Sequence, residues 1–225
     1  MAELSLTQNS KGKNSKGKNS KSKSKKSGKN GDKCQVIDNV ESPTLKVSEI
    51  NEPGFGDFDN KYALGMTTFG DYVYVGTLNA PGFPSDLLPW FSGDPLDTTG
   101  AKVFRGKPDE YHEWNWTPVL DFGQGGLNDN NFGIRKMEVV GDYLYFVTAN
   151  HEAQTGNGVE VWSSPDGVTW QQKSDPGFGE PNNISGRSIA ECGGYLYVGV
   201  ENRETGAELW RHELAADGNI TGTAW

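Results

Sequence analysis

The chain has 225 residues and a formal net charge of −9, which is divided unevenly along it. Residues 1–33 hold ten Lys against Glu3 and Asp32, net +8, and the other 192 residues hold 11 Lys and Arg against 28 Asp and Glu, net −17. The acidic part disfavours nucleic-acid binding, because phosphate contacts need basic side chains. No apolar run approaches the roughly 20 residues that cross a bilayer, and the first thirty residues lack the apolar stretch of a signal peptide. These absences favour a soluble chain and leave its compartment open.

The segment 1–33 is rich in Lys, Ser, Asn and Gly and contains no aromatic residue. Such a composition cannot bury enough apolar surface to offset the entropy of ordering, so we expect a disordered basic tail. The tail could be a solvated linker, an arm that contacts polyanions, or a nuclear signal around Lys21 to Lys26.

One sequence motif occurs three times, as GDYVYVGTLN at 70–79, GDYLYFVTAN at 141–150 and GGYLYVGVEN at 193–202. Each copy follows a marker Asn, and twelve residues separate that Asn from the first Tyr in every copy; the markers are Asn60, Asn131 and Asn183. A motif that recurs at a fixed distance from its marker Asn indicates a repeat architecture.

Each repeat is expected to contain four short antiparallel strands. A first strand leads through a Gly turn into a second strand that is apolar on both faces, as in a strand covered on two sides. A third strand opens with Gly and carries a bulky aromatic residue, and a fourth begins near Trp170; the third-strand aromatics are Phe104, Trp162 and Trp210. This pattern predicts an all-β protein made of β-propeller blades.

The spacing predicts units at about 51–121, 122–173 and 174–225 within a body that spans 34–225. An isolated outer strand is expected at about 44–50. Propellers close with four to eight blades, so three units predict an open arc with two uncovered faces, either as a piece of a longer propeller or as half of a ring of two copies. Uncovered faces of this kind favour self-association.

The loop at 80–99 is the longest connection and is rich in Pro, Gly and aromatic residues. Loops of variable length in repeat arrays often lie on the binding face. Phe83, Trp90 and Phe91 are therefore candidate ligand contacts, and a lid packed on its own propeller is the alternative.

From about residue 44 to 225 the chain resembles a family of repeat propellers related to bacterial-neuraminidase-repeat and kelch-like proteins. That family carries a GFG turn before the marker Asn, a GxLYvGTxN strand and a GxEvWrsxDGxxW segment. The segment from Ser164 to Trp170, with Asp166, is similar to the Asp-box of sialidases but is one residue shorter. The resemblance implies a propeller fold, an extracellular setting and a folding role for Asp166 and Trp170, with no particular activity.

A sialidase site would need three Arg that converge on a carboxylate, together with an acid/base pair. Arg105 and Arg211 occupy equivalent third-strand positions and are expected to be repeat features. The other three, Arg135, Arg187 and Arg203, are expected at unrelated register. A working sialidase is therefore disfavoured.

The candidate metal ligands in the sequence do not follow an established metal-binding spacing. The Gly, Asn and Asp loops before each marker Asn contain calcium-type oxygen ligands but lack the DxDxDG spacing, so turn formation explains them and weak Ca²⁺ binding is the alternative. His112, His151 and His212 show no zinc spacing. Two Cys form no CxxC motif, and the strand pattern predicts that Cys192 is buried and inert. We expect no bound metal or other cofactor.

We expect a non-catalytic binding or scaffold module of the β-propeller type, with a protein or glycan ligand held by loops at one rim. The alternative is a glycan-directed protein, either lectin-like or a remnant of a sialidase-like glycoside hydrolase. In that case loop aromatics would stack on sugar rings.

Overall fold

The computed structural model describes residues 48–79, 100–124, 127, 129–150 and 157–225. By its contacts the chain divides into Met1–Lys46 and Val47–Trp225, and all described residues belong to the second part. The basic tail and the residues Phe83, Trp90 and Phe91 lie outside the described residues.

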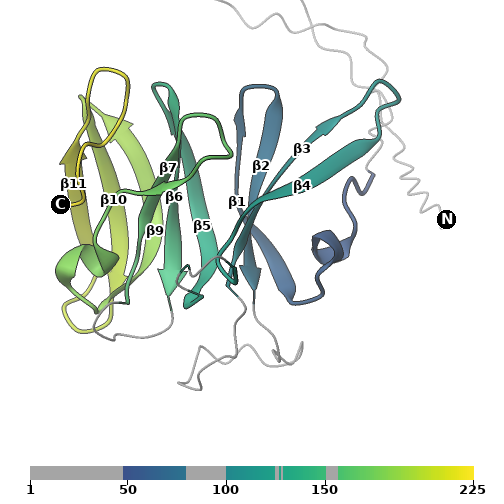
Figure 1. The fold of residues 1–225 in the computed structure, drawn as a ribbon. Coiled ribbons are helices and arrows are strands. Elements are labelled where there is room, and N and C mark those ends of the chain that lie inside the picture. Colours follow the sequence, from purple (N-terminus) through teal and green to yellow (C-terminus); the bar gives the residue numbers. More distant parts are fainter. Residues whose placement is uncertain (1–47, 80–99, 125–126, 128, 151–156) are drawn as a thin grey trace, which may run out of the picture. The chain divides into compact units, whose positions relative to one another are not determined.

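The described residues form an all-β fold, which confirms the predicted class (Figure 1). Within the described ranges, the only helical segments are two single 3₁₀ turns, η1 (Pro53–Gly56) and η2 (Pro176–Gly179). The eleven strands fall into unit 1 (β1 to β4), unit 2 (β5 to β8) and unit 3 (β9 to β11). Their bounds are β1 Asn60–Phe69, β2 Tyr72–Asn79, β3 Lys102–Pro108, β4 Trp114–Asp121, β5 Asn131–Val140, β6 Tyr143–Asn150, β7 Val161–Ser164, β8 Gln171–Gln172, β9 Asn183–Cys192, β10 Tyr195–Asn202 and β11 Glu208–Glu213.

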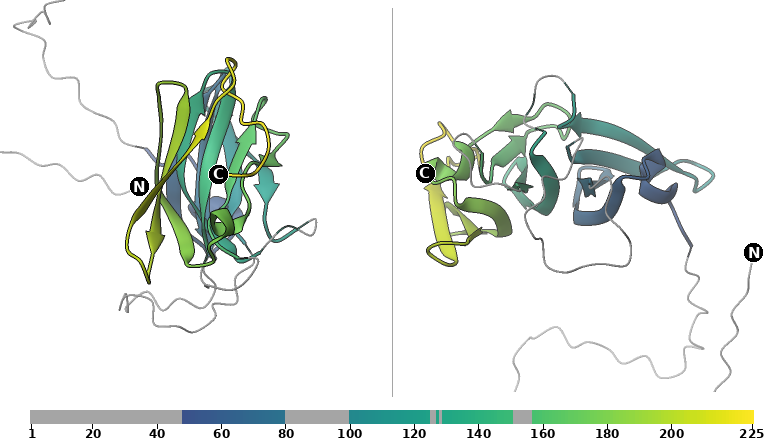
Figure 2. Two further views of the ribbon diagram at one scale, coloured as in Figure 1. Left: turned by 90° about the vertical axis from the view of Figure 1, so that its left-hand side faces the viewer. Right: turned by 90° about the horizontal axis from the view of Figure 1, so that it is seen from below.

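Within each unit, consecutive strands pair antiparallel. Single pairings connect the units, Leu78 with Gly133 and Ala149 with Ser185. The units lie side by side in chain order (Figure 2). The strand order runs from β11 to β4 without returning, so the sheet of described strands is not closed.

The first strands share more than their length. In each first strand, two residues have no opposite residue in the pairing with the second strand. The second of these extra residues is Leu64 in β1, Arg135 in β5 and Arg187 in β9. These are β-bulges, which re-aim side chains locally. Arg135 and Arg187 therefore occupy equivalent positions, so the prediction that they stand at unrelated register was wrong.

Two large hydrophobic clusters lie between the units, beside a small one of Leu78, Phe132 and Ala149. The first joins Tyr74 and Val103 of unit 1 to Met137 and Phe146 of unit 2. The second joins unit 2 to unit 3 through buried side chains that include Tyr145, Val161, Leu196 and Val198. The stability of the array therefore comes mainly from contact between neighbouring units, as in other repeat proteins.

The second strands were predicted to be covered on both faces. Every residue from Tyr74 to Asn79 in β2, and from Leu144 to Asn150 in β6, is buried. In β10, buried residues alternate with half-buried ones. The prediction fails for β10 because no described unit lies on its second face.

The structure bears on two predicted edge features. Of the outer strand expected at 44–50, residues 48–50 alone are described and form no strand, so the strand as a whole stays a prediction. Cys192 was expected to be buried but is an exposed free thiol. It ends β9 on the uncovered side of unit 3.

Candidate functional site

A functional site in a repeat protein is easiest to find after the repeated contacts have been set aside. We call residues repeat-equivalent when they hold the same place in two units, such as the marker residues Asn60, Asn131 and Asn183. Contacts made at repeat-equivalent positions maintain the fold. Side chains without such counterparts are candidates for a specific function.

The marker Asn side chains are used by the fold. The amide of Asn60 donates to the carbonyl of Gly54 (3.0 Å), and that of Asn183 donates to the carbonyl of Gly177 (3.1 Å). Their oxygens accept from Asn79 and Asn202 at 3.2 and 3.1 Å. Asn131 is fully buried and donates to Glu160 instead. Among the described residues, no group of three or more His, Cys, Asp or Glu is placed to hold a metal ion.

The η1 and η2 turns hold an aromatic residue in a strained conformation. Phe55 and Phe178 have φ values of 56° and 59°, which side chains other than Gly rarely adopt. Phe55 stacks on Phe104 with ring centroids 4.6 Å apart, and Phe178 stacks on Trp210 at 5.1 Å. This packing offsets the backbone strain.

Asp166 organises the turn between β7 and β8. One oxygen accepts the backbone N–H groups of Val168 and Thr169 (2.8 and 2.6 Å), and the other accepts the Thr169 hydroxyl (2.8 Å). These bonds, the largest contribution coming from the Thr169 N–H, hold the pKa of Asp166 at about 2. Asp109 and Asp217 accept similar backbone bonds in the other units. Asp166 thus has a contact pattern suited to folding.

The predicted Trp positions take part in packing. Trp162 is 7% exposed, belongs to the cluster between units 1 and 2, and meets Phe122 edge to face at 5.4 Å. Trp210 is half-buried against the cluster between units 2 and 3. Trp170 is also half-buried and lies 4.9 Å from Phe146.

Arg105 and Arg211 behave as repeat features, since each lies over the first Tyr of its second strand, Tyr72 and Tyr195, at 4.5 and 4.6 Å. Arg187 and Arg203 both bind Glu201. Burial, and then the nearby charge of Arg187, lower the pKa of Arg135 to about 10.

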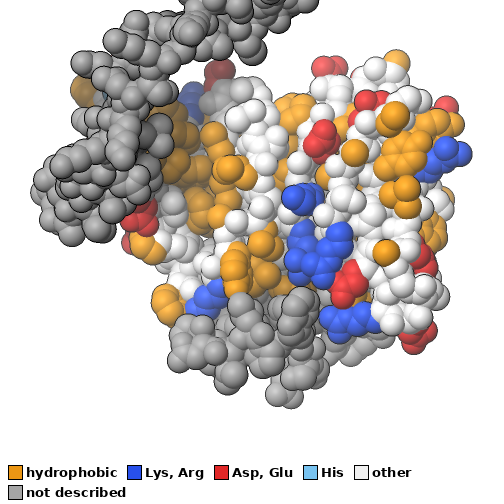
Figure 3. All heavy atoms as spheres, turned by 180° about the vertical axis from the view of Figure 1, so that it is seen from behind, with side chains coloured by type: hydrophobic (Ala, Val, Ile, Leu, Met, Phe, Trp, Pro, Cys, Tyr) orange, Lys and Arg blue, Asp and Glu red, His pale blue; other side chains and the backbone are white. Residues whose placement is uncertain are grey.

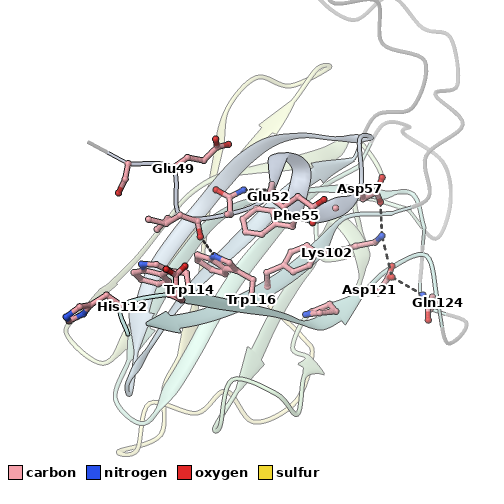
Figure 4. A pocket seen from close by; sticks show the side chains of 17 residues that line it. Glu49, Glu52, Phe55, Asp57, Lys102, His112, Trp114, Trp116, Asp121 and Gln124 are labelled. Atoms are coloured by element: carbon pink, nitrogen blue, oxygen red, sulfur yellow. Dashed lines mark hydrogen bonds and ion pairs between the residues drawn. The ribbon is translucent and has the colours of Figure 1, made fainter. Parts of the chain in front are cut away.

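A cleft of about 970 Å³ lies beside unit 1 (Figure 4). Residues 48–52, η1, β3 and β4 line it. Its aromatic wall contains Phe55, Phe104, Trp114 and Trp116, in which the two indoles stack at 5.4 Å and Trp116 lies edge to face on Phe55 at 5.2 Å. The lining is also acidic, because it contains five carboxylates, Glu49, Glu52, Asp57, Glu113 and Asp121.

Lys102 is the one Lys in the lining of this cleft. Its ammonium lies 2.8 Å from Asp57 and 3.8 Å from Asp121. Burial is the largest influence on Asp57 and opposes its ionisation, but the hydrogen bonds from Lys102 and the Asp59 N–H, with the charges of Lys102 and Lys61, together outweigh it and hold the pKa of Asp57 below its ordinary value. For the same reason the pKa of Lys102 is raised despite burial.

Two of the lining side chains are specific to unit 1. Repeat-equivalent residues of Lys102 are Glu160 and Glu208, which accept the indole N–H groups of Trp162 and Trp210 at 2.8 and 2.9 Å. Unit 1 has Phe104 at the position of these two Trp residues. Because a Phe side chain has no N–H group that needs an acceptor, the position held by Glu160 and Glu208 in the other units can be a Lys in unit 1.

Trp114 is the second unit-specific side chain. Trp116 corresponds to Trp170 and to Trp225, so the counterparts of Trp114, two residues earlier, are Val168 and Thr223. Neither Trp114 nor Lys102 was predicted from the sequence as a site residue. The signal was present, because a repeat alignment isolates both as departures from the shared pattern.

The comparisons with known proteins leave the family open. No family model matches the chain, and no curated protein sequence matches it. Among solved structures, one match is a "putative glycoside hydrolase" from Parabacteroides distasonis, with 10% identity and a TM-score of 0.42 over 73% of this chain and 53% of that one. The chain therefore spans about half the length of that structure, and the proposals below rest on other observations. No helix among the described residues has the length and apolar character to cross a membrane.

Proposed function

We propose that the eleven strands are three consecutive blades of a β-propeller-type repeat, akin to the neuraminidase-repeat and kelch-like families, and that the protein is a non-catalytic binding module. Its ligand lies in the cleft beside unit 1. The observation that carries the proposal is Trp114, which lines this cleft and whose repeat counterparts, Val168 and Thr223, are not aromatic.

The blade assignment is supported by a contact that occurs twice. A Cβ added to Gly167 in unit 2 would lie 1.9 Å from the Tyr74 hydroxyl of unit 1. In the same way, the turn of unit 3 lies on Tyr145 of unit 2, whose hydroxyl donates to the Gly218 carbonyl at 2.8 Å. Each unit thus covers the previous one with its third-to-fourth-strand turn, which suits stacked blades.

The lining favours a sugar as the ligand. Aromatic faces pack against the apolar C–H face of a sugar ring, and carboxylates accept hydrogen bonds from its hydroxyl groups. Five carboxylates against one Lys disfavour an anionic sugar such as a sialoside, because like charges repel in a partly enclosed site. We infer a neutral or amino-bearing glycan.

The charge state of Asp57 suits ligand binding better than a role as general acid. Glycoside hydrolysis needs a carboxylic acid whose pKa is raised so that it can protonate the leaving oxygen. Asp57 has its pKa lowered by Lys102 instead. A charged Asp57 held by an ion pair can accept hydrogen bonds from a ligand but is a poor general acid.

The test is an array of neutral and amino-bearing glycans followed by calorimetry on the best binder. Trp114→Ala should weaken binding at least tenfold. Tyr111→Ala is the matched control, because Tyr111 is 74% exposed near the same hairpin and does not line the cleft. Binding that survives Trp114→Ala refutes this cleft as the site, and loss on Trp90→Ala alone would move the site to the 80–99 loop. Turnover of a neutral glycoside would refute the non-catalytic assignment.

A further inference from the structure

Unit 3 has an uncovered face whose repeat-equivalent in unit 2 is covered. In unit 2 the face toward unit 3 carries Val140, Tyr145, Val159 and Val161, each at most 5% exposed. The counterparts in unit 3 are Cys192, Tyr197, Ala207 and Leu209, which we call the open face of unit 3. Leu209 is 71% exposed, Cys192 and Ala207 are exposed, and Tyr197 is half-buried.

Unit 1 has the complementary face uncovered. Met137 of unit 2 packs into the cluster against unit 1 and is 6% exposed, and Ile189 of unit 3 packs against unit 2. Their counterpart in unit 1 is Met66, which is 69% exposed. Met66 and the half-buried Val73 form what we call the open face of unit 1. The two open faces are therefore the two halves of an interface that this chain already makes twice.

The edge strands support the same arrangement. The segment after β8 lies along β7, since the Lys173 N–H donates to the Val161 carbonyl (2.7 Å) and the Val161 N–H donates to the Ser174 hydroxyl (2.9 Å). The indole of Trp225 donates to the Lys173 carbonyl at 2.8 Å. Trp116 donates to the carbonyl of Ile50 at the same distance. Ile50 thus holds the place of Lys173, but no described third strand lies beside it.

The third strand of unit 3 is β11. Among the described strands it pairs with β10 alone, whereas β3 and β7 each pair on both edges. One copy therefore offers a free third strand at unit 3, and another offers an outer segment at Ile50 with no third strand. Hydrophobic side chains reach the surface at the β11 end (Figure 3).

We propose that the open face of unit 3 binds the open face of unit 1 in a second copy of this chain, head to tail. The contact repeats the packing between neighbouring units, so it rests on the blade assignment proposed above but not on the glycan. Phe178 and Trp210 pack on the cluster that contains Val159 and Val161. The partner would accordingly cover Phe55 and Phe104 of the cleft, and a ligand bound there should weaken association.

The test measures the mass of the full chain in solution by sedimentation over a concentration series. The wild type should associate, and Leu209→Asp and Met66→Asp should each be monomeric. An equimolar mixture of the two variants should form a heterodimer, because one copy keeps an intact unit 1 face and the other an intact unit 3 face. Phe58→Asp is the control, since Phe58 is 86% exposed outside both faces and should leave association unchanged.

The reactivity of Cys192 is a second measurement, which shows whether the open face of unit 3 is covered. Cys192 should react with a maleimide fast in either monomeric variant and several-fold more slowly in the associated wild type, as read by peptide mapping that separates it from Cys34. A wild type that stays monomeric at its highest soluble concentration overturns the proposal. Association that persists in Met66→Asp overturns the head-to-tail geometry. Trp114→Ala should still associate, so failure of the glycan proposal is distinguishable from failure of this one.

Discussion

Tyr145→Phe tests the contact that joins neighbouring units. The Tyr145 hydroxyl is buried, donates to the Gly218 carbonyl at 2.8 Å and accepts from the Ile220 N–H at 3.0 Å. Phe keeps the ring but leaves two buried backbone groups unpaired. Each such group costs about 1 to 3 kcal/mol, so we expect a loss of about 2 to 6 kcal/mol of unfolding free energy. Urea denaturation followed by tryptophan fluorescence measures it.

Tyr197→Phe is the matched control. Tyr197 is the repeat-equivalent of Tyr145, is half-buried, and its hydroxyl makes no hydrogen bond within the described part of the chain. At concentrations where the chain is monomeric, this change should cost less than about 0.5 kcal/mol. Equal losses for the two substitutions would refute the role of the hydroxyl as the link between units.

The same pair of variants has a pH signature. Burial raises the pKa of Tyr145 to about 12, while the Tyr of an unfolded chain ionises near its ordinary pKa of 10.0. The stability linked to the neutral hydroxyl is therefore complete below pH 10 and is lost as pH rises towards 12. Tyr145→Phe should lose less stability over this alkaline range than the wild type does.

Three further predictions use other parts of the chain. Trp162→Ala should cost about 3 to 5 kcal/mol by opening a cavity, and Trp210→Ala should cost less because Trp210 is half-buried; equal costs in thermal unfolding would contradict this order. The pKa of Asp166 is lowered to about 2, so its stabilising effect is present above the ordinary pKa of about 4 and is lost as pH falls through 2; Asp166→Asn should flatten this acid limb, and an unchanged limb would argue against the turn. Deletion of 1–33 should leave the melting temperature within a few degrees, and a larger drop would mean that the tail docks on the acidic body.

The sequence by itself determined the all-β class, the repeat register and the contacts that depend on short separations. Strand alternation and Gly turns are local, so the first strands predicted before the Gly turns correspond to β1, β5 and β9. The Asp166 turn is equally local, because its carboxylate bonds groups within three residues. Repetition strengthened these predictions, since three copies had to agree.

The tertiary structure decided which faces are covered and which side chains meet across units. Cys192 and its counterpart Val140 stand in similar strand patterns, yet Cys192 is exposed and Val140 is 5% exposed, because only Val140 has a neighbouring unit beside it. The cleft depends in the same way on residues 48–52 lying near Trp116, 66 residues beyond Ile50. Such contacts arise from packing between distant segments, and no local pattern in the chain encodes them.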